Sequence, residues 1–324
     1  MQLDKVVVTG VAGFIGSHLA EALLGRGVSV VGVDRRRAEE DLVAAENLAG
    51  LLEQPGFHLV EGDLTELDLV PMIGEASTVF HLAGLPGVRP SWGDRFGEYL
   101  SANIAATQRV LEACVTTRLP RLVLASSSSV YGGSADRPLS EDDLPAPRSP
   151  YGVTKLAAER LALAYAARPD APTSVVALRY FTVYGPRQRP DMAIGRILRA
   201  ALTRDHLRLF GDGSQRRDFT YVDDAVAATI AAATAPAHGE ALNVGGGRSW
   251  SMLEVLELAA EVTGLDVPLV REGRQLGDVE ATDADLTRTR AVLGYQPSVS
   301  LPDGMSRQWQ WIAAQHRLAI AASV

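Results

Sequence analysis

The chain of 324 residues has few of the residues that carry disulfide or metal chemistry. Its single cysteine, Cys114, excludes an intramolecular disulfide, and its six histidines are scattered without the spacing of a metal site. No apolar run reaches the roughly 18 residues of a membrane span, and the N-terminus lacks the features of a signal peptide. We therefore expect no resident metal and a cytoplasmic protein that contacts no membrane.

Basic residues are outnumbered by acidic ones, and nearly all of them are arginine. The formal net charge of −8 disfavours nucleic acid or an anionic membrane as a general partner. Only two lysines, Lys5 and Lys155, occur among 31 basic residues. Because an ammonium is a compact charge with a readily shifted pKa, a retained lysine can mark a site where guanidinium does not serve. Lys5 precedes the first predicted strand, whereas Lys155 requires a chemical reason.

Buried β-branched runs alternate with helical patterns over residues 1–180. Strands are predicted at 5–10, 28–34, 57–63, 77–84, 121–128 and 173–181, and helices at 14–27, 94–118 and 151–168. The alternation predicts an α/β fold, a doubly wound parallel (Rossmann) sheet with right-handed crossovers. Residues 181–324 are predicted to form a smaller α/β substrate lobe with helices near 250–263 and 301–320. The stretch 218–247, with a buried run at 241–247, is expected to return to the first domain.

Three glycines in the segment GVAGFIG stand between the first strand and the first helix. Gly10, Gly13 and Gly16 allow a tight turn and let a pyrophosphate approach the free N–H groups at the helix N-terminus. Asp34 ends the second strand, where it can accept hydrogen bonds from the adenosine ribose. Its carboxylate favours NAD over NADP, although the arginines that follow it leave a 2′-phosphate possible. Asp63 can reach the adenine.

The segment YGVTK places Tyr151 and Lys155 four residues apart, on one face of a predicted helix. A phenol has an ordinary pKa of about 10, too high for a base at neutral pH. A neighbouring ammonium and a positive nicotinamide ring would favour the phenolate and lower that pKa. This chemistry supplies the reason for Lys155.

Together these motifs resemble the extended short-chain dehydrogenase/reductase superfamily, in its nucleotide-sugar epimerase/dehydratase branch. The resemblance covers essentially the whole chain. It implies a Ser–Tyr–Lys triad of Ser127, Tyr151 and Lys155, bound NAD, a nucleoside-diphosphate sugar substrate, and a homodimer built from the two long helices. With the motifs, it assigns cofactor binding to Gly10, Gly13, Phe14, Ile15, Gly16, Asp34, Arg35, Asp63, Leu64, Leu82, Ala83, Gly84, Asn103, Ala125, Tyr151, Lys155, Tyr180, Thr182 and Val183.

Four consecutive serines end the strand at 121–128. Sugar 4,6-dehydratases of this superfamily carry acids at the two positions after the triad hydroxyl, and UDP-glucuronate decarboxylases carry glutamate at the second of them. Here those positions are Ser128 and Ser129. Two neutral hydroxyls can donate hydrogen bonds to a substrate that already bears a negative group. A polar serine loop without such a role is the alternative.

Further segments are similar to UDP-glucuronate 4-epimerases, namely those at 87–92, 181–193, 216–224 and 274–285. The resemblance places Arg187 near the sugar carboxylate, Arg217 at the pyrophosphate and Asp278 at the uridine ribose, whereas Arg89 and Arg189 can equally be solvated surface charges. Pro86, in HLAGLPG, departs from the epimerase pattern and leaves the contacts of 84–88 open. The predicted substrate-binding residues are Arg89, Ser127, Ser128, Ser129, Thr182, Arg187, Arg189, Arg217, Gln275 and Asp278.

The sequence therefore predicts NAD-dependent 4-epimerisation of UDP-glucuronate to UDP-galacturonate. Three alternatives remain open at this stage. They are a UDP-glucose 4-epimerase, a UDP-glucuronate decarboxylase, which Ser129 disfavours, and a non-catalytic dinucleotide-sensing protein, which would not need Tyr151 and Lys155 together.

Overall fold

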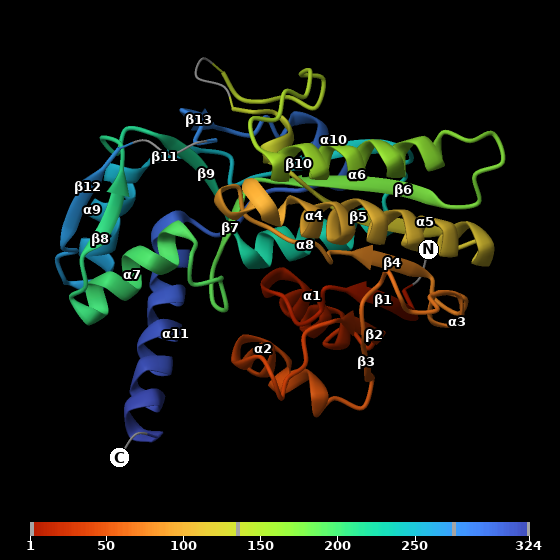
Figure 1. Ribbon diagram of the computed structural model, residues 1–324, viewed down its shortest axis with the longest axis horizontal. Coiled ribbons are helices and arrows are strands. Elements are labelled where there is room, and N and C mark those ends of the chain that lie inside the picture. Colours follow the sequence, from red (N-terminus) through yellow and green to blue (C-terminus); the bar gives the residue numbers. More distant parts are fainter. Residues whose placement is uncertain (1–2, 134–136, 274–276, 323–324) are drawn as a thin grey trace.

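The computed structural model describes residues 3–133, 137–273 and 277–322, and its centre is a parallel sheet (Figure 1). Seven strands lie in the order β10-β6-β5-β4-β1-β2-β3, each pairing in parallel with its neighbours. Their bounds are β1 Lys5–Thr9, β2 Ser29–Asp34, β3 Phe57–Glu61, β4 Thr78–His81, β5 Arg121–Ser127, β6 Ser174–Tyr180 and β10 Glu240–Val244. The predicted fold class is confirmed.

Each face of this sheet has its own hydrophobic core, because successive side chains of a strand point to opposite faces. Val6 and Val8 of β1 pack with α1 (Phe14–Leu24), α2 (Leu42–Leu52) and α8 (Val222–Thr234). Val7 packs on the other side with α3 (Val70–Ile73), α5 (Ala106–Thr117) and α6 (Pro150–Ala166). Both faces are therefore buried, as the continuous apolar runs require.

The helix predicted at 94–118 is interrupted. It comprises α4 (Phe96–Tyr99), a π-helical turn (Leu100–Ala105) and α5, preceded by two 3₁₀ turns at Arg89–Ser91 and Gly93–Arg95. The second long helix, α6, has a clear local cause for its start. The Ser149 side chain accepts a hydrogen bond from the backbone N–H of Gly152, and Pro150 occupies the first helical position.

The smaller lobe contains short strands in two sheets. Strands β11 (Ser249–Ser251), β9 (Arg216–Tyr221) and β13 (Ala281–Thr282) form one sheet with β7 (Thr182–Tyr184), and β12 (Leu269–Glu272) pairs with β8 (Leu207–Phe210). The helices of this part are α7 Ala193–Thr203, α9 Met252–Thr263, α10 Thr287–Leu293 and α11 Leu301–Ala322. The chain returns to the large sheet through α8 and β10, whereas β9, at the start of the predicted return, lies in the small sheet.

Within the described ranges, no helix combines the length and the apolar character needed to cross a membrane.

Candidate active site

A cavity of about 740 Å³ lies between the carboxyl ends of the large sheet's strands and the smaller lobe. Its walls include β5 and the start of α6 on one side and β8 and β9 on the other. Ligands of open α/β sheets bind at this end of the strands. The cavity wall includes these predicted residues: Gly10, Gly13, Phe14, Ile15, Gly16, Asp34, Arg35, Asp63, Leu64, Leu82, Ala83, Gly84, Arg89, Ala125, Ser127, Ser128, Ser129, Tyr151, Lys155, Tyr180, Thr182, Val183, Arg187, Arg189, Arg217 and Asp278.

The glycine turn is packed too closely against neighbouring backbone to accept side chains. Gly10 has a φ of +73°, and a Cβ there would lie 2.7 Å from the backbone nitrogen of Ala83. A Cβ on Gly16 would overlap the carbonyl oxygen of Gly10. Gly13 is the N-cap of α1. Because glycine has no side chain, no side chain caps the first N–H groups of this helix, and these residues line the cavity. The turn therefore fits the pyrophosphate of a dinucleotide.

Asp34 lies beside this turn with its carboxylate nearly buried. It accepts hydrogen bonds from the backbone N–H groups of Ala12 and Arg36, both at 3.0 Å. The neighbouring arginines already have acidic partners. Arg36 Nε lies 3.5 Å from Asp34 Oδ1, and Arg35 Nη1 lies 3.3 Å from Asp63 Oδ2. The charges around the ribose site therefore fit an unphosphorylated ribose better than a 2′-phosphate.

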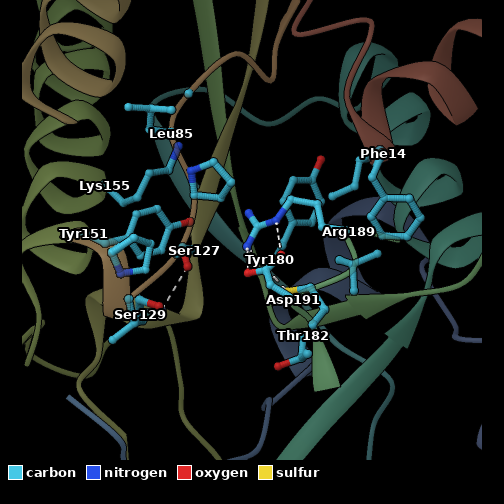
Figure 2. A pocket seen from close by; sticks show the side chains of 18 of the residues that line it. Phe14, Leu85, Ser127, Ser129, Tyr151, Lys155, Tyr180, Thr182, Arg189 and Asp191 are labelled. Atoms are coloured by element: carbon cyan, nitrogen blue, oxygen red, sulfur yellow. Dashed lines mark hydrogen bonds and ion pairs between the residues drawn. The ribbon is translucent and has the colours of Figure 1, made fainter. Parts of the chain in front are cut away.

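The three triad side chains meet at the end of β5 (Figure 2). Ser127 is the last residue of β5, and its hydroxyl accepts a hydrogen bond from the backbone N–H of Ser129 at 3.1 Å. Tyr151 stands in the first turn of α6, and its phenol lies close to the Ser127 hydroxyl (Figure 2). Lys155 follows one turn later and is buried. This is the arrangement that the Tyr151 and Lys155 spacing predicts.

The expected lowering of the Tyr151 pKa is not present in the protein alone. Burial raises the pKa of the Tyr151 phenol, while the Ser127 hydrogen bond and the charge of Arg189 act against that rise. Burial also lowers the pKa of Lys155 to about 8, and the charge of Glu159 opposes this. Desolvation therefore outweighs the nearby charges at Tyr151, and Lys155 keeps its ammonium below a pH of about 8.

Two predicted substrate arginines are held by carboxylates. Arg187, whose φ is +64°, binds Glu21 of α1 through both Nη atoms at 2.8 and 2.6 Å, and its Nε donates to His18. Its guanidinium thus has an acidic partner on α1, and its contact with a sugar carboxylate stays a prediction. Arg189 binds Asp191 at 2.9 and 2.7 Å (Figure 2).

The far end of the cavity combines an aromatic ring with charged groups. The guanidinium carbon of Arg89 lies 4.0 Å from the centroid of the Phe210 ring, and Arg89 Nη2 lies 3.6 Å from Asp278 Oδ2. Arg217 lines the same end, where burial lowers its pKa and the charge of Asp278 raises it. An apolar ring beside these groups can accept a planar base, and the arginines can bind phosphate.

Comparison with known proteins identifies the family of this chain. The sequence model of the NAD dependent epimerase/dehydratase family matches residues 6–245. The chain belongs to this family. A Bacillus subtilis protein described as an uncharacterized UDP-glucose epimerase is 40% identical over 317 residues, 97% of this chain and 99% of the relative.

Two similar solved structures carry ligands. MoeE5, solved with NAD and either UDP-glucuronic acid or UDP-glucose, is 50% identical with a TM-score of 0.88, over 96% of this chain and 99% of MoeE5. The UDP-glucuronic acid 4-epimerase of Bacillus cereus was solved with UDP-glucuronic acid and NAD. It is 40% identical, with a TM-score of 0.91, over 96% of this chain and 99% of the epimerase chain. The present family member is an NAD-dependent nucleotide-sugar 4-epimerase, an isomerase, and its cofactor is NAD.

Sequence reasoning missed the residues that position Tyr151. The Ser91 hydroxyl accepts a hydrogen bond from the Tyr151 backbone N–H at 3.1 Å, and the Tyr99 ring meets the Tyr151 ring edge-on at 6.4 Å between centroids. Ser91 lies in the segment at 87–92 that the sequence analysis singled out without giving it this role. Phe210 was also missed, although an aromatic residue directly before GDG at a strand end was an available signal.

Two predicted site residues are not part of the described cavity wall. Asn103 is buried, and its side chain bonds the backbone N–H and C=O of Leu85 and the hydroxyl of Thr154. Its amide joins the loop after β4 to α6, and the cofactor contact expected of it stays a prediction. Gln275 lies outside the described residues.

We expect the purified protein to release NAD when it is denatured. Asp34 would repel a 2′-phosphate, and Arg35 and Arg36 are already paired with carboxylates. The measurement is chromatographic identification of the released dinucleotide against both standards. Release of NADP alone would overturn the cofactor assignment.

Proposed function

We propose that this enzyme interconverts UDP-glucuronate and UDP-galacturonate. The observation that carries the proposal is the hydroxyl-lined turn beyond the triad. Ser128 and Ser129 begin the 3₁₀ turn Ser128–Val130 and line the cavity directly after Ser127. Hydroxyls at these positions add no negative charge and can donate hydrogen bonds to an anionic sugar, and the missing acid disfavours elimination and decarboxylation. The Bacillus cereus relative, named for this activity, supports the same substrate.

The proposed chemistry begins at the sugar 4-hydroxyl. NAD, held by the glycine turn and Asp34, would supply a reversible acceptor for the C4 hydride, so that the reaction involves no net oxidation. Tyr151, as phenolate, takes the proton from the 4-hydroxyl and later gives it back. Ser127 orients the hydroxyl, and the Lys155 ammonium stabilises the phenolate.

The ketone intermediate makes the position of the carboxylate decisive. With a C4 ketone beside the C5 carboxylate the sugar is a β-keto acid, which loses CO₂ when the bond to the carboxylate aligns with the ketone π system. The enzyme has to keep that bond out of alignment while the sugar turns. Ser128, Ser129 and Thr182 line the cavity and are our candidates for this task. Arg187 could join them only by leaving Glu21.

A neutral-sugar 4-epimerase is the second candidate. The Bacillus subtilis relative is described as a UDP-glucose epimerase, and MoeE5 has been solved with UDP-glucose as well as UDP-glucuronic acid. Both substrates share the UDP portion, so the cavity end around Phe210 does not distinguish them. The serine turn is the part of the cavity that favours the acid.

The test is incubation with UDP-glucuronate and, separately, UDP-glucose, with the products followed by NMR. We expect UDP-galacturonate from the acid and a much lower turnover of UDP-glucose. Preferred conversion of UDP-glucose would establish the second candidate. Release of CO₂ with a UDP-pentose as the main product would make the enzyme a decarboxylase.

We further propose a homodimer formed through α5 and α6. These helices pack side by side on one face of the sheet (Figure 1), and Leu100, before α5, and Val153, on α6, are more than two-fifths exposed. The resemblance to the superfamily, which implies a homodimer built from the two long helices, is the main support for this proposal. Light scattering should give twice the chain mass of 34.5 kDa, and a monomer at micromolar concentration would contradict the proposal.

We also propose the domain division that the sequence suggests. Residues 1–180, with the stretch 218–247 that supplies α8 and β10, would bind NAD, and the remainder of 181–324 would bind the nucleotide sugar. The parallel pairing of β10 with β6 and the position of the cavity support this division.

A further inference from the structure

A buried ion pair lies on the same helix as the triad. Glu159 of α6 and Arg179 of β6 have side chains that are 0% and 2% exposed, and they form two contacts, at 2.6 and 3.0 Å. The Ser126 hydroxyl donates a third hydrogen bond to the carboxylate at 2.6 Å. Ser126 is the one serine of the four-residue run that the proposed chemistry does not use. Burying such a pair costs desolvation free energy that its attraction need not recover, so stability alone is a weak explanation for its presence.

The position of Glu159 relative to the triad suggests that role. Tyr151, Lys155 and Glu159 follow one another at intervals of four residues and therefore share one face of α6. Lys155 is buried, and burial lowers its pKa to about 8, while the negative charge of Glu159 acts in the opposite direction. In the chemistry proposed above, loss of the Lys155 proton would remove the charge that stabilises the Tyr151 phenolate.

Other charged or titratable groups pack around Lys155. His81, at the end of β4, faces it, and burial together with the Lys155 charge lowers the pKa of His81 to about 3. His81 is thus neutral near pH 7, and its ring bonds the hydroxyls of Thr9 and Thr107. His81 therefore brings no negative charge to Lys155.

Behind Glu159, further hydrogen bonds fix Arg179. Its Nη1 donates to the Tyr131 hydroxyl at 2.7 Å and to the backbone carbonyl of Glu141 at 3.3 Å. The Tyr131 hydroxyl in turn donates to Asn243 of β10 at 2.7 Å. Burial raises the pKa of Tyr131 to about 12, so the phenol is neutral. Burial also raises the pKa of the Glu141 carboxyl, whose oxygen accepts from the Asn243 backbone.

We propose that Glu159, fixed by Arg179 and Ser126, is a positioning residue that keeps the Lys155 ammonium charged beside Tyr151. The proposal rests on the proton chemistry proposed above for the triad. It predicts that removal of the Glu159 charge makes Lys155 lose its proton at lower pH. The high-pH limb of the epimerisation rate should then move to lower pH by the same amount.

The two-lysine composition allows a direct test that needs no sugar substrate. Protein labelled with ¹³C at the lysine Cε gives signals from Lys155 and from Lys5, which pairs with Glu75 at the surface. A Lys5→Arg variant assigns them. In the NAD-loaded enzyme, Glu159→Gln should lower the Lys155 titration midpoint by roughly one pH unit or more. The Lys5 signal should titrate as in the unmodified protein.

Matched variants separate charge from structure. Glu112→Gln makes the same substitution at an exposed carboxylate on α5 and should leave the Lys155 midpoint unchanged. Glu159→Asp keeps the negative charge, so its Lys155 midpoint should stay close to that of the unmodified enzyme. If Glu159→Gln does not fold, Glu159→Gln/Arg179→Gln removes both charges. The midpoint should fall by less than a single Glu159→Gln change would give, because the Arg179 charge that opposes Glu159 is removed as well.

Equal Lys155 midpoints in the unmodified enzyme and in the folded variants that carry Glu159→Gln would overturn the proposal and leave the pair a core salt bridge. A shift of the midpoint with no conversion of UDP-glucuronate by the unmodified enzyme would refute the proposed substrate and retain the charge relationship. A midpoint shift without a matching shift in the rate profile of an active enzyme would also overturn the positioning role.

Discussion

Tyr151→Phe should reduce 4-epimerisation of UDP-glucuronate by roughly 10²-fold or more, which is the usual contribution of a general acid–base group. Phenylalanine keeps the ring that packs edge-on against Tyr99 and removes the hydroxyl that lies close to Ser127. The fold and the NAD content should therefore survive. The measurement is initial rate by NMR or coupled assay, with released NAD quantified for both proteins.

Tyr99→Phe is the matched control for this substitution. The Tyr99 hydroxyl donates to the backbone carbonyls of Pro86 and Gly87 at 3.1 and 3.2 Å, so its removal affects a loop and leaves the proton path intact. We expect a much smaller loss of rate. Near-normal turnover by Tyr151→Phe would show that the 4-hydroxyl proton goes elsewhere.

Ser129→Glu should lower epimerisation and increase the share of turnovers that end in a UDP-pentose or its 4-keto form. If Ser129 lies at the sugar carboxylate, the new acid places a second negative charge in a confined site. At an effective dielectric constant of about 20, like charges about 4 Å apart repel by roughly 4 kcal/mol. The substrate carboxylate then leaves its place, or the glutamate takes up a proton with a raised pKa.

Ser129→Ala is the milder comparison. It removes one hydrogen bond to a charged group, worth roughly 1.5–3 kcal/mol, and adds no charge. Product partition by NMR distinguishes the two variants. If Ser129→Glu converts UDP-glucuronate at the normal rate with no new product, Ser129 does not contact the carboxylate and the serine run is a polar loop.

Local sequence patterns were enough to predict the large sheet and the cofactor turn. The buried β-branched runs specify strands covered on both faces, and Gly10, Gly13 and Gly16 meet a steric requirement that the sequence shows directly. The pairing of Tyr151 with Lys155 followed for the same reason, since helical spacing puts both on one face, whereas Ser127 came from the resemblance to the superfamily.

Contacts between distant segments were not predictable in this way. Glu21 is an ordinary exposed residue of α1 in the sequence, and only the fold brings it to Arg187, 166 positions away. The sequence likewise does not show that the π-helical turn places the Asn103 amide against Leu85 and Thr154. The short strands of the smaller lobe, such as the two-residue β13, give too little periodicity to read.

The junction of β6 and β7 has a consequence for domain motion. A single residue, Phe181, separates the two strands, and its backbone N–H bonds Val244 of the large sheet at 2.9 Å. The next residue, Thr182, already pairs with Phe219 of the small sheet. A hinge at this point would break backbone hydrogen bonds to both sheets, so we expect the two lobes to move little against each other. The keto sugar must then turn by its own bond rotations between rigid walls, and the hydroxyls on those walls set which rotations are allowed.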